Sequence, residues 1–158
     1  MKKVMIALDY DPIAQKVAES GFKLAQTMGA EVTLLHVVTN VKYYSTTGVT
    51  PIIGFTDHIN AVPLFVEKHD DLKDRTSEFL TRTKNYLGDK SINILIKEGD
   101  LADTILDTAK ELNADLIVMG SHSRRWLDNI LMGSVTEKVL KKTEIPLFIV
   151  PLRQSQES

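Results

Sequence analysis

The sequence predicts an α/β fold in which helices cover both faces of a five-stranded, parallel, doubly wound sheet. Two observations predict it: short apolar runs of strand length recur along the chain, and segments with helical spacing of apolar residues separate them. Strands that alternate with helices form parallel sheets, and right-handed crossovers leave few possible topologies. The length of 158 residues and the hydrophobic fraction of 43% suit a single domain, which we place over residues 1–152.

The first quarter of the chain contains two predicted strands with a helix between them. Residues 3–8 are almost all apolar and predict the first strand. Asp11 and Pro12 then supply an N-cap residue and a proline at the first helical position. The helix that they begin has apolar residues at helical spacing, and Gly29 ends it. Residues 32–38 predict the second strand.

Residues 39–66 interrupt this alternation. The segment contains two prolines and two glycines and has no sustained period. A loop of this length is uncommon in a compact domain unless it has a function. The apolar side chains between Tyr43 and Phe65 leave two interpretations open: a surface excursion with a short helix, or a lid or partner-binding surface.

The remaining elements resume the alternation to the end of the chain. In order we expect a helix over 72–87 closed by Gly88, a strand over 92–96, a helix capped by Asp100, a strand over 115–119, a helix over 134–142, a strand over 146–150 and a polar tail over 153–158. In such a sheet ligands bind beyond the carboxyl ends of the strands, where the strand order reverses. The first strand lies beside that reversal, so the residues that follow it are candidates for a site.

Composition excludes several classes of function. The chain has no cysteine, which excludes disulfides, thiol nucleophiles and Cys-ligated metals and fits a cytoplasmic location. Its longest apolar run, residues 145–152, is far shorter than the roughly 20 residues of a membrane span, so we expect no membrane partner. The net charge of −2 gives no basic field for nucleic acid. Residues 120–158, however, carry 6 basic and 4 acidic side chains, a local excess that can attract a small anion.

The glycine-containing loop after the fourth strand has the features of an anion site. Gly120 allows the backbone to approach a ligand closely. Gly133 and Ser134 stand where the next helix begins, so unpaired N–H groups and a partial positive charge are expected there. The Ser134 hydroxyl can cap the helix or bond a phosphate, and Arg124 and Arg125 are near enough to supply charge. The alternative is an ordinary strand-to-helix loop with a serine cap.

This loop resembles the signature of the universal stress protein family: Gly, two residues, Gly, nine residues, Gly, then Ser or Thr. Gly120, Gly133 and Ser134 match the first glycine, the third glycine and the hydroxyl position, while Ser123 replaces the second glycine. Residues 7–9, 35–37, 115–120 and 145–147 extend the resemblance along nearly the whole chain.

The resemblance implies the strand order 3-2-1-4-5, homodimers through the last strand (Pro146–Val150) and bound ATP or ADP, possibly with Mg²⁺. It places Asp9 beside the ribose or the metal and Val37 beside the adenine. The residues that it assigns to the nucleotide site are Ala7, Asp9, Val37, Met119, Gly120, His122, Ser123, Arg124, Gly133, Ser134 and Val135.

Ser123 bears on whether the phosphates are accepted. If the backbone there is left-handed, a non-glycine residue costs about 1–2 kcal/mol. Its hydroxymethyl group could fill the phosphate space, or its hydroxyl could bond the phosphate.

We expect a nucleotide-binding regulatory module of the stress response rather than an enzyme, because no nucleophile–base or acid–base pair is recognisable. Two alternatives stay open: a nucleotide-free dimeric interaction module that uses the 43–65 segment, and a slow ATP hydrolase in which Asp9 and a metal position water. The last strand is apolar and, in the implied order, lies at the sheet edge, where it invites antiparallel pairing with a second copy. Asp11 either joins Asp9 in holding Mg²⁺ or only caps its helix.

Overall fold

The computed structural model describes residues 2–9, 14–39, 69–121 and 133–152. In chain order the elements are β1 (Lys3–Ala7), α1 (Ala14–Met28), β2 (Glu31–Val38), α6 (His69–Leu87), β3 (Asn93–Glu98), α7 (Leu101–Leu112), β4 (Leu116–Gly120), α8 (Ser134–Lys142) and β5 (Leu147–Val150). The five strands form one parallel sheet in the order β3-β2-β1-β4-β5, which confirms the expected fold and order.

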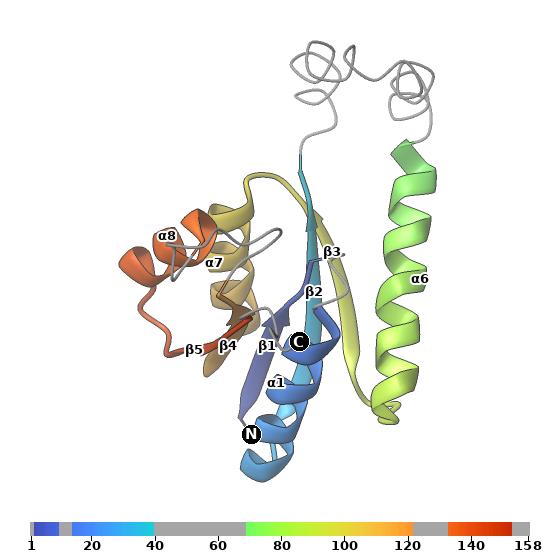
Figure 1. Ribbon diagram of the computed structural model, residues 1–158, viewed down its shortest axis with the longest axis horizontal. Helices are drawn as coiled ribbons and strands as arrows, with labels where there is room; N and C mark the ends of the chain where they lie inside the picture. Colours follow the sequence, from blue (N-terminus) through green and yellow to red (C-terminus); the bar gives the residue numbers. More distant parts are fainter. Residues whose placement is uncertain (1, 10–13, 40–68, 122–132, 153–158) are drawn as a thin grey trace, which may run out of the picture.

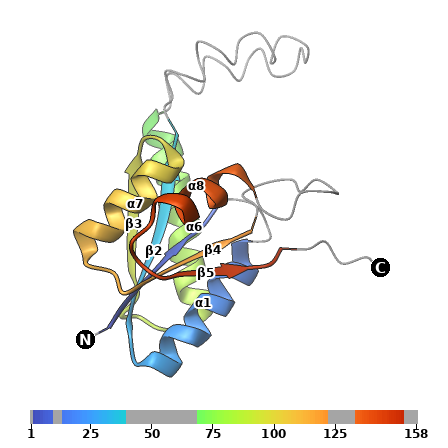
Figure 2. The ribbon, with the colours of Figure 1, turned by 90° about the vertical axis from the view of Figure 1, so that its left-hand side faces the viewer.

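Helices cover both faces of the sheet (Figures 1 and 2). α1 and α6 pack on one face, where Val4 and Ile6 of β1 meet Leu80 of α6. α7 and α8 pack on the other face, where Met5 of β1 meets Ile105 of α7. Successive side chains of a strand point to opposite faces, and here both faces are buried. That is why these strands read as continuous apolar runs in the sequence.

Most predicted boundaries agree with the structure to within one residue, and the exceptions are the start of α6 and the third strand. α6 begins at His69, three residues before the predicted start at residue 72. β3 continues to Glu98, two residues beyond the prediction, because Lys97 and Glu98 pair with Val37 and Val38 of β2. An edge strand does not need apolar side chains to continue its ladder, so apolar content alone ended the predicted strand too early.

The predicted end residues of three helices are confirmed. Asp100 has an extended backbone, and its carboxylate accepts a hydrogen bond from the Asp103 N–H at 3.0 Å. Gly29 and Gly88 follow their helices with φ of 64° and 79°, a left-handed conformation that glycine adopts without strain.

Some predictions concern residues outside the described ranges. These are the Asp11-Pro12 cap, the insertion from residue 40 onward, the loop residues His122 to Trp126 and the tail over 153–158. Within the described ranges, no helix has both the length and the apolar composition for crossing a membrane.

β1 and β4 lie side by side at the centre of the sheet, and the chain leaves them in different directions. The helix that follows β1 is α1 on one face, whereas the helix that follows β4 is α8 on the other face. The carboxyl ends of these two strands therefore form the reversal point at which doubly wound sheets bind ligands.

Candidate functional site

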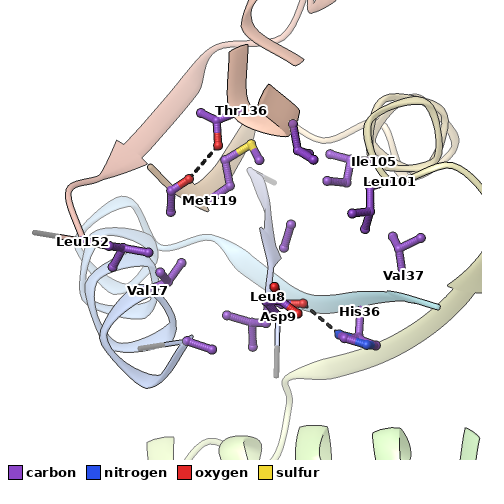
Figure 3. A pocket seen from close by; sticks show the side chains of 14 residues that line it. Leu8, Asp9, Val17, His36, Val37, Leu101, Ile105, Met119, Thr136 and Leu152 are labelled. Atoms are coloured by element: carbon purple, nitrogen blue, oxygen red, sulfur yellow. Dashed lines mark hydrogen bonds between the residues drawn. The ribbon is translucent and has the colours of Figure 1, made fainter. Parts of the chain in front are cut away.

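A cavity that is open to solvent lies at the carboxyl ends of β1, β2 and β4 (Figure 3). Its lining residues are Ala7, Leu8, Asp9, Ala14, Val17, His36, Val37, Leu101, Ile105, Met119, Gly120, Val135, Thr136 and Leu152. The cavity occupies the reversal point that the sheet topology indicates.

Six of the eleven predicted site residues surround this cavity: Ala7, Asp9, Val37, Met119, Gly120 and Val135. Gly133 and Ser134 directly precede Val135 at the start of α8 and are not among the described residues that line the cavity. His122, Ser123 and Arg124 lie outside the described residues.

Most of the cavity wall is apolar. Val37, Leu101 and Ile105 approach it from one side, while Val17 and Leu152 approach it from the other (Figure 3). Val37 and Ile105 are nearly fully buried, as is the thioether of Met119 nearby. Such a wall suits a flat, apolar ring system, and a methionine adapts readily to the shape of its partner.

Asp9 and His36 are the two titratable residues among those that line the described cavity. Asp9 stands two residues beyond the end of β1. An ionised carboxylate only accepts hydrogen bonds, so at this position it selects ligand groups that donate them, such as hydroxyls.

His36 is buried at the end of β2, and its Nδ1 lies 2.8 Å from the carbonyl oxygen of Leu8. A carbonyl oxygen cannot donate, so Nδ1 carries the hydrogen. Burial lowers the pKa of His36 below its usual 6.5, although the Leu8 hydrogen bond and the charge of Asp9 act in the opposite direction. The ring is therefore neutral at pH 7. It packs edge to face against Phe79, with 6.4 Å between the two ring centroids.

The start of α8 differs from the predicted serine cap. Gly133 is the N-cap, with φ −71° and ψ 163° and no side-chain cap, and Ser134 is the first helical residue. The Gly133 N–H donates to the Ser121 carbonyl at 2.6 Å, so it is engaged within the protein. The N–H groups of Ser134 and Val135 belong to the first turn and have no partner within the helix. Serine was expected as the cap on residue type alone; the helix begins at Ser134 as predicted, and the N-cap is the residue before it.

Four hydrogen bonds join the ends of β4, α8 and β5 beside the cavity. The Thr136 hydroxyl donates to the Gly120 carbonyl at 2.8 Å (Figure 3), and the Gly133 N–H donates to the Ser121 carbonyl. The Ser121 hydroxyl accepts from the Leu152 N–H at 2.9 Å, and the Ser121 N–H donates to the Val150 carbonyl at 2.9 Å. These bonds hold the two ends of the 122–132 segment together and tie them to the chain that leaves β5.

The structure gives Gly120 a packing role beside the predicted one. A Cβ at Gly120 would lie 2.3 Å from Cδ1 of Leu152 and 3.1 Å from Cγ2 of Val17. The space that a side chain would fill is therefore occupied by the cavity wall. Whether the backbone of Gly120 also approaches a ligand, as we predicted from the sequence, stays a prediction.

Sequence reasoning missed several residues of the site: Val17, His36, Leu101, Ile105, Thr136 and Leu152. Val17 and Ile105 were recognised only as inner faces of helices. His36 offered a usable signal, because it is a polar residue among the apolar residues of the carboxyl half of its strand. Thr136 carried a weaker signal: it lies in the first turn of the helix that we predicted to begin at residue 134.

The described residues contain no group of three or more His, Cys, Asp or Glu side chains that could hold a metal ion. A metal at this cavity would therefore need oxygen ligands from elsewhere, such as the phosphates of a bound nucleotide.

Comparisons with known proteins agree on one family. A sequence model described as "Universal stress protein family" matches residues 1–151. The stress response protein NhaX of Bacillus subtilis is 28% identical, with 94% of this chain and 96% of NhaX covered. Universal stress protein MJ0531 of Methanocaldococcus jannaschii is 30% identical, with 94% of this chain and 81% of that protein covered.

Solved structures give the same result for the fold. The structure of MJ0577, also from Methanocaldococcus jannaschii, has a TM-score of 0.72 and 25% identity and covers 98% of both chains. A universal stress protein in complex with cAMP has a TM-score of 0.58 and 17% identity, with 94% of this chain and 95% of that chain covered.

Proposed function

Because the chain belongs to the universal stress protein family, we propose that it is a regulatory module that binds ATP or ADP at the carboxyl ends of β1 and β4. One observation carries the proposal: a single cavity combines an apolar wall, a carboxylate and the start of a helix. The solved family member in complex with cAMP supports an adenine nucleotide as the ligand class.

The residues of the cavity fit the parts of such a nucleotide. The wall formed by Val37, Ile105 and Met119 suits the adenine ring. The Asp9 carboxylate can accept hydrogen bonds from the ribose hydroxyls. The start of α8 supplies the N–H groups of Ser134 and Val135 and the positive end of a helix dipole for the phosphates.

Fewer hydrogen-bond donors are available to the phosphates than the sequence suggested. The Gly133 N–H is engaged by Ser121, so the donors that remain at the described start of α8 are the next three amides, those of Ser134, Val135 and Thr136, and the exposed Ser134 hydroxyl. The local excess of basic residues over 120–158 supports an anion at this end. Mg²⁺ would arrive with the phosphates, and Asp9 is the carboxylate that the described cavity offers it.

We propose that the protein binds the nucleotide and does not turn it over, and that binding acts on the contact between two copies of the chain. β5 lies at an edge of the sheet, and Phe148 on it is 37% exposed. An apolar edge strand pairs readily with a second chain, so we place a two-fold homodimer contact at β5. The Ser121 bonds tie the chain at the end of β5 to the end of β4 beside the cavity, which offers a route from site to contact. The lack of cysteine supports a cytoplasmic location.

The phosphate assignment can be tested with two substitutions of nearly equal shape, Gly133→Asp and Gly133→Asn. The backbone of Gly133 is extended, the conformation in which Asp and Asn cap helices, so either side chain can cap α8. Both variants should unfold at a temperature equal to or above that of the wild type. Only the Asp variant places a negative charge beside the phosphates.

We expect the Asp variant to bind ATP on the order of 10-fold or more weakly than the Asn variant in calorimetric titration at low salt, because like charges at this range repel. Equal ATP affinity in the two variants would refute the phosphate position.

A further inference from the structure

We infer that His36 is a positioning residue of the nucleotide site: its ring N–H holds the Leu8 carbonyl and so fixes the backbone that presents Asp9 to the ribose. The inference rests on the proposed function. It goes beyond that function by naming the group that makes the site selective for ligands with ribose hydroxyls.

The contact lies where the sheet stops supporting β1. The pairing of β1 with β2 ends at Ala7 and Leu35. One residue further, the Leu8 N–H still donates to the Leu35 carbonyl at 2.8 Å. The Leu8 carbonyl is then bonded by the His36 side chain at 2.8 Å, so the ring extends the attachment of β1 to β2 by one group (Figure 3).

This contact acts directly on Asp9. A peptide unit is planar, so the Leu8 carbonyl, the Asp9 N–H and the Asp9 Cα share one plane. A hydrogen bond that fixes the direction of the carbonyl therefore fixes the position of the Asp9 Cα. Asp9 and His36 both line the cavity, so the atoms fixed in this way are at the site and not behind it.

The ring itself is held rigidly. His36 is 6% exposed, and it meets Phe79 of α6 edge to face, with an angle of 71° between the rings. Burial also lowers the pKa of His36, which keeps the ring neutral with its hydrogen on Nδ1. Leu34 and Val38, its neighbours along β2 on the same face of the sheet, are apolar and buried, and a buried polar side chain between them is costly unless its hydrogen bond is made.

The test compares His36→Phe, which keeps a ring but removes the donor, with His36→Asn, whose side-chain amide can replace Nδ1–H. Calorimetry measures the affinity of each protein for ATP and for 2′,3′-dideoxy-ATP, which lacks the ribose hydroxyls. We expect His36→Phe to bind ATP on the order of 10-fold more weakly, the loss of one hydrogen bond to a charged group, and to bind dideoxy-ATP nearly as well as the wild type does. His36→Asn should restore the preference for ATP.

Two results would overturn the inference: an unchanged ATP affinity in His36→Phe, or an equal loss for both nucleotides, which is the signature of a merely structural role. If His36→Phe does not fold, as judged by thermal unfolding without ligand, His36→Gln replaces it, because its amide reaches the Nε2 position and not Nδ1. The same two results then count against the inference. Failure of the wild-type protein to bind ATP would instead refute the proposed function, and that result needs no variant.

Discussion

The packing of Leu152 against Gly120 gives a prediction with a computable size. In Gly120→Ala the new methyl group would lie 2.3 Å from Cδ1 and 3.2 Å from Cγ of Leu152. Carbon atoms in contact are separated by about 3.5–4.0 Å, so Cδ1 must retreat by about 1.2 Å or more. The Leu152 backbone cannot simply follow, because its N–H is bonded to the Ser121 hydroxyl. The leucine side chain must therefore leave its position in the cavity wall.

Overpacking of this kind costs about 1–3 kcal/mol of unfolding free energy. Leu152→Ala alone removes a buried side chain and should cost about 2–5 kcal/mol. In the double variant Gly120→Ala/Leu152→Ala, the new methyl group enters space that the leucine has vacated. The clash with Leu152 disappears and only the approach to Val17 Cγ2 at 3.1 Å stays, so the double variant should lose roughly 1–3 kcal/mol less than the sum of the single losses.

Urea unfolding of the four proteins, followed by circular dichroism, measures these free energies, with equal m-values as the control for an unchanged folded state. Losses that add to within about 0.5 kcal/mol would show that the two sites are independent and would refute the stated packing.

Three further predictions concern the same region. Thr136→Val should cost about 1–3 kcal/mol in urea unfolding, because it leaves the Gly120 carbonyl without the Thr136 hydroxyl, whereas Thr136→Ser should retain most of the stability; equal losses would contradict that bond. The pKa of His36 is lower in the folded than in the unfolded chain, so its contribution to stability is complete above pH 6.5 and is lost as the pH falls below that value. In His36→Asn, the unfolding free energy measured in urea should therefore change less between pH 8 and pH 5.5 than in the wild type. An equal change in both proteins would argue against a buried neutral ring. In analytical ultracentrifugation the wild-type protein should sediment as a dimer and Phe148→Lys as a monomer. A wild-type protein that is monomeric at every concentration would refute the dimer contact at β5.

The fold could be predicted from the sequence because its main signals are local. A strand buried on both faces is apolar throughout, and Gly29 and Asp100 mark helix ends through conformations that few other residues favour. The end of β3 was misplaced because Lys97 and Glu98 continue the strand through pairing with β2, which the side chains do not reveal.

The site was predicted only in part, because several of its contacts join distant segments. The His36 ring meets a carbonyl 28 residues earlier in the chain, and Leu152 meets Ser121 across 31 residues. No spacing within the sequence encodes these distances; they appear only when the strand ends are brought together. The residues after strands one and four were found because the reversal point depends on topology alone.

Binding of Mg-ATP by the wild-type protein, after removal of any co-purified nucleotide, tests the proposed function most directly. Isothermal titration calorimetry should show one site per chain with a roughly micromolar Kd, or about −8 kcal/mol, and Gly133→Asp should bind on the order of 10-fold or more weakly than Gly133→Asn. No binding heat and no thermal stabilisation at millimolar ATP would contradict the proposal, and the cavity between β1 and β4 would then belong to a family fold that does not use it for nucleotides.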